Sequence, residues 1–149
     1  MFTHSFVYTS APCIEACPSK IDVPKYIDGV KGGKFDFALG VILDKYPMAA
    51  TCGRVCVRFC EDACRRSSID GAVGIRMLKR YAADQAIANK RLQFSKPTLQ
   101  HHKRVAVVGA RPAGITCAYK LLLGGIQVDV FDAQHAAGGM SSLGLPSYL

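Results

Sequence analysis

The stretch Cys52-Gly-Arg-Val-Cys56-Val-Arg-Phe-Cys60-Glu-Asp-Ala-Cys64 organises this chain, because a cysteine recurs in it at every fourth position. A second pair with the same spacing, Cys13 and Cys17, lies upstream. Thiolates are soft ligands that favour zinc, copper(I) and iron–sulfur clusters. Paired cysteines of zinc sites are typically about two to four residues apart, so the spacing alone does not exclude zinc.

A single helix cannot bring these cysteines to one metal. At about 1.5 Å per residue, a helix would hold Cys52 and Cys64 about 18 Å apart, and no single metal centre spans that distance. Either turns break the stretch, or its cysteines are shared between two centres. Cysteines also pack as small hydrophobic residues, but two groups at one repeated spacing favour metal ligands. The candidate ligands are Cys13, Cys17, Cys52, Cys56, Cys60 and Cys64.

Composition narrows the class of protein. The 149 residues, 50% of them hydrophobic, suffice for one ordinary domain or two small ones. Seven cysteines without a secretory signal indicate a reducing compartment, and no apolar run approaches the roughly 20 residues that cross a bilayer. We therefore expect a cytoplasmic chain with no membrane partner. The net charge of +8 comes from basic residues spread along the chain, so we expect no nucleic-acid partner either.

Helical periodicity dominates residues 1–91. Asp22 followed by Pro24 predicts a capped helix that ends at Gly32, and a second helix is expected over 34–45. We interpret the apolar stripes of these two helices as core rather than as cofactor contacts. Their members are Tyr26, Ile27, Val30, Phe35, Ala38, Leu39, Ile42 and Leu43.

A longer helix is expected from about residue 73 to residue 90. Its predicted apolar face holds Ile75, Leu78, Ala82 and Ile87, whereas Arg76, Lys79 and Arg80 fall mostly off it. Such a small helical unit has little core of its own, so metal binding would supply much of its folding free energy. Residues 92–103 are polar and are interpreted as a linker, with His101 and His102 exposed rather than bound to metal.

The second part of the chain has a different pattern. The apolar run over 104–109 is typical of a strand buried in a parallel sheet. A glycine turn follows and opens a helix that ends at Gly124, and a second strand over 127–132 ends in Asp132. This order predicts a β-α-β dinucleotide-binding unit in which backbone N–H groups of the turn bind a pyrophosphate and Asp132 accepts from a ribose hydroxyl. The turn residues are Gly109, Ala110, Arg111, Pro112, Ala113 and Gly114.

Arg111 departs from this pattern. It stands where the middle glycine of G-x-G-x-x-G normally lets the backbone approach the pyrophosphate. Its charge could pair with phosphate, but its side chain crowds the turn, and we expect a net weakening of dinucleotide binding. Cys117, in the helix that follows, is interpreted as a packing residue.

Together these motifs resemble the glutamate synthase small (beta) subunit family. The same module is similar to the N-terminal part of dihydropyrimidine dehydrogenase and to the large subunit of NADH-dependent ferredoxin:NADP oxidoreductase. The motifs that carry the resemblance are Cys13-x3-Cys17-Pro, Ile21-Asp-Val-Pro, the four-cysteine stretch, Ile75-Arg-Met-Leu-Lys-Arg and the β-α-β pattern. Gly138-Gly139-Met140 resembles the family's continuation, which adds Gly139 to the candidate cofactor contacts.

The resemblance implies an α+β fold. Residues 1–91 would form an all-α iron–sulfur domain, 92–103 a linker, and 104–149 the start of a Rossmann-like FAD-binding domain. In the family, the helical domain holds two [4Fe–4S] clusters that exchange electrons with FAD. By position, Cys13 and Cys64 would serve one cluster, and Cys17, Cys56 and Cys60 the other.

The chain departs from the family at two ligand positions. The upstream C-x2-C that normally completes the first cluster falls at Ser5 and Tyr8, and the fourth ligand of the second, a glutamate or glutamine in many members, falls at Lys79. A protonated lysine does not bind iron, and Cys52 is our candidate replacement. We therefore expect one firmly held [4Fe–4S] cluster, with a second only if ligands come from elsewhere.

The leading hypothesis is an electron-transfer module of an NAD(P)H-linked flavin and iron–sulfur oxidoreductase. Family members are several hundred residues long, so the chain is interpreted as an N-terminal fragment or a truncated reading frame, inactive alone. FAD would bind in the full-length context and NAD(P)H through regions that this sequence lacks. The expected partner is the rest of the oxidoreductase or a partner redox subunit, with ferredoxin as a further candidate. The alternative is a zinc-stapled binding or scaffold module without redox function.

Overall fold

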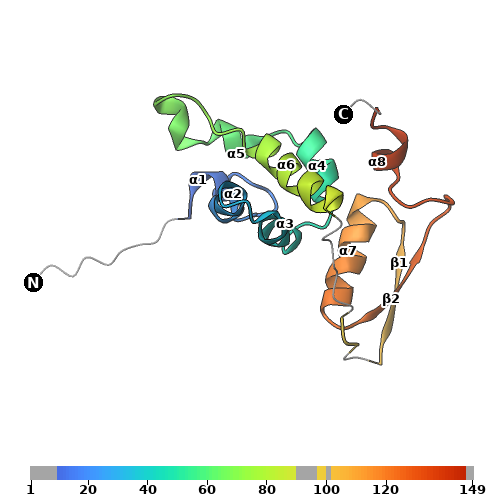
Figure 1. The fold of residues 1–149 in the computed structure, drawn as a ribbon. Coiled ribbons are helices and arrows are strands. Elements are labelled where there is room, and N and C mark those ends of the chain that lie inside the picture. The colour runs from blue at the N-terminus through green and yellow to red at the C-terminus, as the bar shows by residue number, and fades with distance from the viewer. Residues whose placement is uncertain (1–9, 90–96, 100–101, 147–149) are drawn as a thin grey trace, which may run out of the picture.

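The computed structural model describes residues 10–89, 97–99 and 102–146, and its first part is helical (Figure 1). The helices are α1 (Pro12–Glu15), α2 (Val23–Lys31), α3 (Phe35–Leu43), α4 (Ala49–Val55), α5 (Phe59–Asp62) and α6 (Ile75–Ala88), with a 3-10 turn η1 (Arg65–Ser68) between the last two. The two predicted helices of the N-terminal region and the predicted long helix are thus present. The long helix, predicted from about residue 73 to residue 90, begins and ends about two residues inside these bounds.

Local signals in the sequence place the first long helix. Asp22 caps α2, because its Oδ1 accepts a hydrogen bond from the backbone N–H of Lys25 at 3.2 Å. Pro24 lies in the first turn, where its missing N–H costs nothing, and Gly32 follows the last helical residue. The predicted cap and both predicted ends of this helix are confirmed.

The core of the helical part forms where α2, α3 and α4 pack against α6. Tyr26 of α2 and Ile42 of α3 are fully buried there. The Tyr26 hydroxyl donates a hydrogen bond of 2.9 Å to the carbonyl of Ile75, which ties α2 to the start of α6. Phe35 and Tyr81 add an edge-to-face ring contact with centroids 5.3 Å apart.

The buried face of α6 differs from the predicted one. Ile75 and Ala82 are buried as expected, but Ile87 is 50% exposed and Lys79, predicted to lie off this face, is only 6% exposed. The reason is geometric, since positions 75, 79, 82 and 86 follow the i, i+4, i+7 spacing of one helix face. Because Lys79 occupies the second of these positions, a search for apolar residues alone does not identify this face.

The four-cysteine stretch is broken by a turn. α4 ends at Val55, the next residue Cys56 is extended, and Arg58 adopts a left-handed conformation with φ of 70° before α5 begins. The spacing left open whether turns break the stretch or its cysteines are shared between two centres. The structure shows that a turn breaks the stretch. The turn brings Cys60 into one cavity with Ile75 and Lys79 of α6 instead of carrying it further along the axis of α4.

The second part of the described chain is a small β-α-β unit. It consists of β1 (Arg104–Val108), α7 (Pro112–Leu123), β2 (Gln127–Phe131) and a short α8 (Met140–Leu143). The strands are parallel, with Arg104 opposite Gln127 and Val108 opposite Phe131. Figure 1 shows α7 alongside both strands. The order of strand, glycine turn, helix and strand is confirmed, and the fold is mixed α and β as expected.

The strands are less buried than predicted. Val107 is buried under α7, but Val108 is 87% exposed and Phe131 is 57% exposed. Continuously apolar strands are typical of sheets that are covered on both faces. Within the described residues α7 covers only one face of this sheet, so the other face is exposed. Cys117 of α7 is likewise exposed, so its predicted packing role is wrong. Of the two linker histidines, His102 is exposed and His101 lies outside the described residues.

The division into units at 91 and 104 stays a prediction. Residues 90–96 and 100–101, which hold most of the expected linker, lie outside the described part of the chain. One described contact joins the two parts, a hydrogen bond from the Lys120 ammonium of α7 to the backbone carbonyl of Asp44 after α3.

Candidate metal centre

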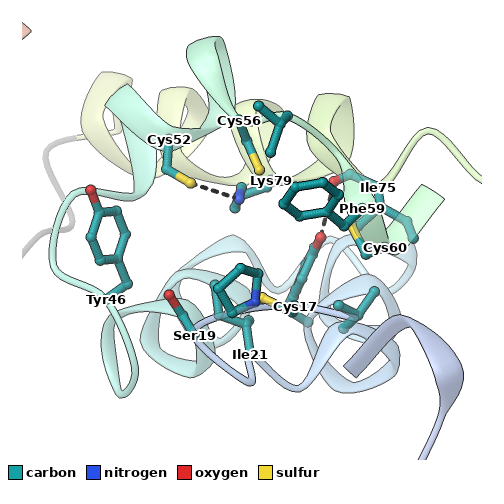
Figure 2. Close-up of a pocket in the computed structure, with 14 residues that line it drawn as sticks. Cys17, Ser19, Ile21, Tyr46, Cys52, Cys56, Phe59, Cys60, Ile75 and Lys79 are labelled. Atoms are coloured by element: carbon teal, nitrogen blue, oxygen red, sulfur yellow. Dashed lines mark hydrogen bonds between the residues drawn. The ribbon is translucent and has the colours of Figure 1, made fainter. Parts of the chain in front are cut away.

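Four cysteines line one cavity of about 250 Å³ in the helical part (Figure 2). Cys17 comes from the turn after α1, Cys52 from α4, Cys56 from the end of α4, and Cys60 from α5. Figure 2 shows Cys52 and Cys56 on one side of this space and Cys17 on the opposite side. We call this space the cysteine pocket. Residues 35 to 43 positions apart in the sequence thus meet because the turn after α4 and the packing on α6 bring them together.

The walls of the cysteine pocket are mainly apolar. Besides the four cysteines, they include Pro18, Ile21, Val23, Tyr26, Tyr46, Val57, Phe59 and Ile75. The interpretation of the α2 stripe as core alone is therefore too narrow, since Tyr26 belongs both to the core and to the pocket wall. Apolar walls keep water away from a metal centre and thereby influence its reduction potential.

Lys79 is the charged member of the cysteine pocket. It projects from α6, and its Nζ donates a hydrogen bond of 3.0 Å to the Sγ of Cys52. Burial lowers the pKa of Lys79, but the hydrogen bond to Cys52 and the nearby thiols outweigh it, so the pKa is raised overall and the side chain is an ammonium at neutral pH. Sequence reasoning identified Lys79 as the position of a family ligand but missed its burial, which its i+4 spacing from Ile75 would have indicated.

Burial also affects the thiols. Desolvation raises the pKa of Cys60 to about 11, with neighbouring Cys56 and Cys17 adding to the effect. It raises the pKa of Cys52 as well, against the opposing influence of the Lys79 hydrogen bond. Metal ligation requires thiolates. A metal that binds in the cysteine pocket must therefore displace protons from these side chains.

The remaining two candidate ligands lie in a second, more open hollow. Cys13 of α1 and Cys64 after α5 line it together with Ser10, Arg65 and Arg66. The structure thus separates Cys13 from Cys17, although the two are only four positions apart. Cys13 and Cys64, which the sequence resemblance assigned to one cluster, thus line the same hollow, whereas Ser5 and Tyr8 lie outside the described residues.

The donor set of the cysteine pocket suits a polynuclear cluster. Its four cysteines line one mainly apolar space and come from three segments of the chain. Soft thiolates around an apolar space are the environment of iron–sulfur clusters, whereas a structural zinc site draws its ligands to about 2.3 Å from one ion.

The glycine turn of the second part shows a tightly packed geometry. Gly114 at the start of α7 lies so close to the turn that a Cβ there would be 1.8 Å from the carbonyl oxygen of Gly109. This is the close approach of helix and strand that the third glycine of the dinucleotide motif permits. Pro112 and Ala113 form the first turn of the helix, as predicted.

Asp132 points back to this turn. Its carboxylate accepts hydrogen bonds from the backbone N–H of Gln134 at 2.7 Å and of Ala110 at 2.6 Å. These bonds and the nearby Arg111 guanidinium lower the pKa of Asp132, so this side chain is an anion at neutral pH. The side chain of Arg111 lies over Gly139, where a Cβ would come within 2.7 Å of its Cγ. Of the predicted dinucleotide contacts, Gly109, Arg111 and Asp132 line one open hollow together.

A helical unit that gathers thiols around an apolar space, followed by a small β-α-β unit, is the arrangement of an iron–sulfur protein with an attached α/β segment. The chain belongs to the family described as dihydropyrimidine dehydrogenase domain II, 4Fe-4S cluster, whose model matches residues 7–91. The resemblance drawn from the sequence motifs is confirmed, and with it the iron–sulfur assignment and the hypothesis of an electron-transfer module.

Three relatives extend the match beyond residue 91. The chain is 42% identical to the NADPH-Fe(3+) oxidoreductase subunit beta of Geobacter sulfurreducens over 97% of its own length and 22% of the relative's. It is 36% identical to the NADP(+)-dependent formate dehydrogenase subunit beta of Moorella thermoacetica, over 95% of this chain and 23% of the relative. It is 32% identical to the NAD-dependent dihydropyrimidine dehydrogenase subunit PreT of Salmonella typhimurium, over 93% of this chain and 34% of the relative. The chain therefore spans about a quarter to a third of these proteins.

Proposed function

We propose that this chain is an electron-transfer module in which Cys17, Cys52, Cys56 and Cys60 hold one [4Fe–4S] cluster. The observation that carries the proposal is the placement of four cysteines from three segments of the chain around one apolar cavity. When bound, such a cluster supplies a one-electron carrier. The protein supplies the thiolates, limits water access with the buried Ile21, Tyr26 and Ile75, and fixes the ligand positions through α6.

The lining of the cysteine pocket supports Cys52 as the fourth ligand of the proposed cluster. Cys52 lies in the same cavity as the three cysteines that the family resemblance assigns to one cluster. Lys79 points into that cavity as an ammonium and has no lone pair to offer a metal. Cys52 is therefore the donor that completes the set. The hollow with Cys13 and Cys64 contributes two thiols within the described residues, so a second cluster would need further donors.

Anaerobic reconstitution of the 149-residue chain tests this function. We expect brown protein with broad absorbance near 400 nm and about four irons and four sulfides per chain. Cys56→Ser is expected to lose most of this iron, whereas Cys117→Ser, which changes an exposed cysteine outside the pocket, is expected to keep it. Colourless protein with tightly held zinc would overturn the proposal, and about eight irons per chain would show that the second hollow also holds a cluster.

For the second part, we propose the start of a Rossmann-like domain that binds FAD when completed by a longer chain. The support is the close Gly109–Gly114 approach, the N-terminus of α7 behind the turn, and Asp132 at the end of β2. NAD(P)H would act through regions beyond this part, because the relatives' names refer to NADPH, NADP(+) or NAD. The partner would be a redox subunit, since these relatives are named as subunits.

Seven free thiols suit a reducing compartment, and on that ground we propose a cytoplasmic location. No helix in the described part of the chain is long and apolar enough to cross a bilayer.

A further inference from the structure

Lys79 is the one charged side chain that the described part of the chain buries, with 6% of its surface exposed. Its ammonium points into the cysteine pocket and lies 3.0 Å from the Sγ of Cys52 (Figure 2). The cysteine pocket that it enters is also lined by Cys17 and Cys56, and all three thiols would become thiolates on binding metal. A buried ammonium without a compensating anion is costly. Metal-bound thiolates in the pocket would supply the counter-charge of Lys79.

The packing of α4 on α6 fixes this contact. Gly53, next to Cys52, lies against Arg80, next to Lys79, so closely that a Cβ on Gly53 would be 2.8 Å from the Cα of Arg80. One position further along α4, Arg54 forms two hydrogen bonds of 3.0 and 3.1 Å with the carboxylate of Asp84 on α6. The two helices are thus held together directly beside the Lys79–Cys52 pair, and the lysine is part of a built site.

We propose that Lys79 is a positioning residue that donates a hydrogen bond to the sulfur of Cys52, does not itself bind iron, and raises the reduction potential of the centre held in the cysteine pocket. This inference rests on the proposed function of that pocket as a cluster site. Reduction adds one electron and so increases the negative charge held by the thiolates. A fixed ammonium in an apolar cavity stabilises the more negative state more strongly, and hydrogen bonds to ligand sulfurs act in the same direction.

Redox titration of the reconstituted 149-residue chain tests the effect on potential. Dithionite is the reductant, and electron paramagnetic resonance measures the reduced fraction. We expect Lys79→Met to lower the ratio of reduced to oxidised centre at a fixed potential at least tenfold, which is about 59 mV for a one-electron couple. Lys79→Arg, which keeps the charge, is expected to restore part of the shift.

Lys31→Met is the matched control, because it removes the same charge from the exposed end of α2. It is expected to leave the potential near that of the unchanged protein. An unchanged potential in Lys79→Met, or an equal shift in both variants, would overturn the role of Lys79 while leaving the cluster assignment intact. If the unchanged protein is colourless and holds no iron after reconstitution, the proposed function and this inference are both overturned.

A second measurement needs no substitution and decides the case in which Lys79→Met fails to fold. The unchanged chain is labelled with nitrogen-15 lysine, and the reduced centre is studied by pulsed electron paramagnetic resonance. A weak nitrogen-15 coupling supports the proposal, because the lysine nitrogen would be hydrogen-bonded to the Cys52 sulfur and not bound to iron itself. A strong coupling would place the lysine nitrogen on iron, and no coupling would place it away from the centre. Either result contradicts the proposal.

Discussion

At the scale of single residues, burial in the cysteine pocket keeps Cys60 protonated until metal binds. The pKa of Cys60 is about 11 because the thiolate form is poorly solvated beside Cys56 and Cys17. At neutral pH the metal-free side chain is therefore a neutral thiol. Because the thiolate is the form that binds metal, cluster assembly releases a proton from this residue.

The reactivity of Cys60 in the metal-free chain should follow this pKa. Iodoacetamide attacks the thiolate, whose fraction rises with pH until the pKa is passed. We expect the alkylation rate of Cys60 in the folded chain, followed by peptide-resolved mass spectrometry, to increase up to about pH 11. In urea, where the thiol is solvated, the rate should level off near its ordinary pKa of about 8.5. A plateau at the same pH in both states would contradict the expectation.

The same scale shows what sequence patterns convey. The thiols were predicted because soft ligands at a repeated spacing indicate a metal site directly. The burial of Lys79 was not predicted. A buried helix face is identified by apolar residues at helical spacing, and a lysine does not count as one of them. Only the position of Cys52 opposite it, set by the packing of two helices, explains the exception.

At the scale of elements, the contact between α4 and α6 depends on a residue without a side chain. Gly53 lets the α4 backbone approach Arg80, and this approach places Cys52 beside Lys79. Arg54 and Asp84 then fix the rotation of the two helices.

Gly53→Ala should therefore destabilise the protein. The added methyl group would overlap the α6 backbone, and overpacking of this kind costs about 1–3 kcal/mol. Thermal unfolding of the holo-protein under anaerobic conditions measures the change. The iron content should fall as well, because α4 must move away from α6.

Gly40→Ala is the matched control for that substitution. Gly40 lies within α3, and a Cβ there meets nothing within 4 Å. Because alanine favours a helix interior over glycine by about 0.5–1 kcal/mol, this variant should be slightly more stable than the unchanged protein. Equal destabilisation by both substitutions would show that the Gly53 contact is unimportant.

Elements were predicted better than their exposure. Asp22, Pro24 and the glycine turns mark helix ends through local chemistry, and those ends were found. The apolar run over 104–109 indicated a strand that can be buried, but its sequence does not indicate which segment would cover it, and Val108 is exposed in the described part of the chain. Likewise, the break after α4 rests on a left-handed Arg58, a conformation that its residue type does not indicate.

At the scale of the whole molecule, the helical part should depend on its metal. Ligands from α4, α5 and the turn after α1 meet in one pocket, so a bound cluster would connect segments that otherwise share a small core. Removal of iron by a chelator under reducing conditions is expected to lower the midpoint of thermal unfolding of α1–α6, followed by circular dichroism. Unchanged helical signal and midpoint after complete iron loss would contradict this expectation.

The β-α-β part should bind FAD weakly by itself. Two strands leave one sheet face uncovered within the described residues, and Arg111 occupies space above Gly139 beside the turn. We expect calorimetric titration of the 149-residue chain with FAD to give weak or no binding. Arg111→Gly, in a chain extended to the length of the relatives, should tighten binding, where each 1.4 kcal/mol or so corresponds to tenfold.

Tight FAD binding by the 149-residue chain would show that neither the uncovered sheet face nor Arg111 limits the site. Gly40→Ala in the extended chain provides the control, because it lies in the helical part far from the turn in sequence.

The two-stranded sheet also influences how the molecules behave toward one another. In the described residues each strand has an outer edge of backbone N–H and C=O groups without a neighbouring strand, beside the exposed Val108 and Phe131. Such edges are templates onto which a strand of another molecule can add. As the concentration of the isolated chain is raised, self-association should therefore occur through the β-α-β part rather than through the helical part.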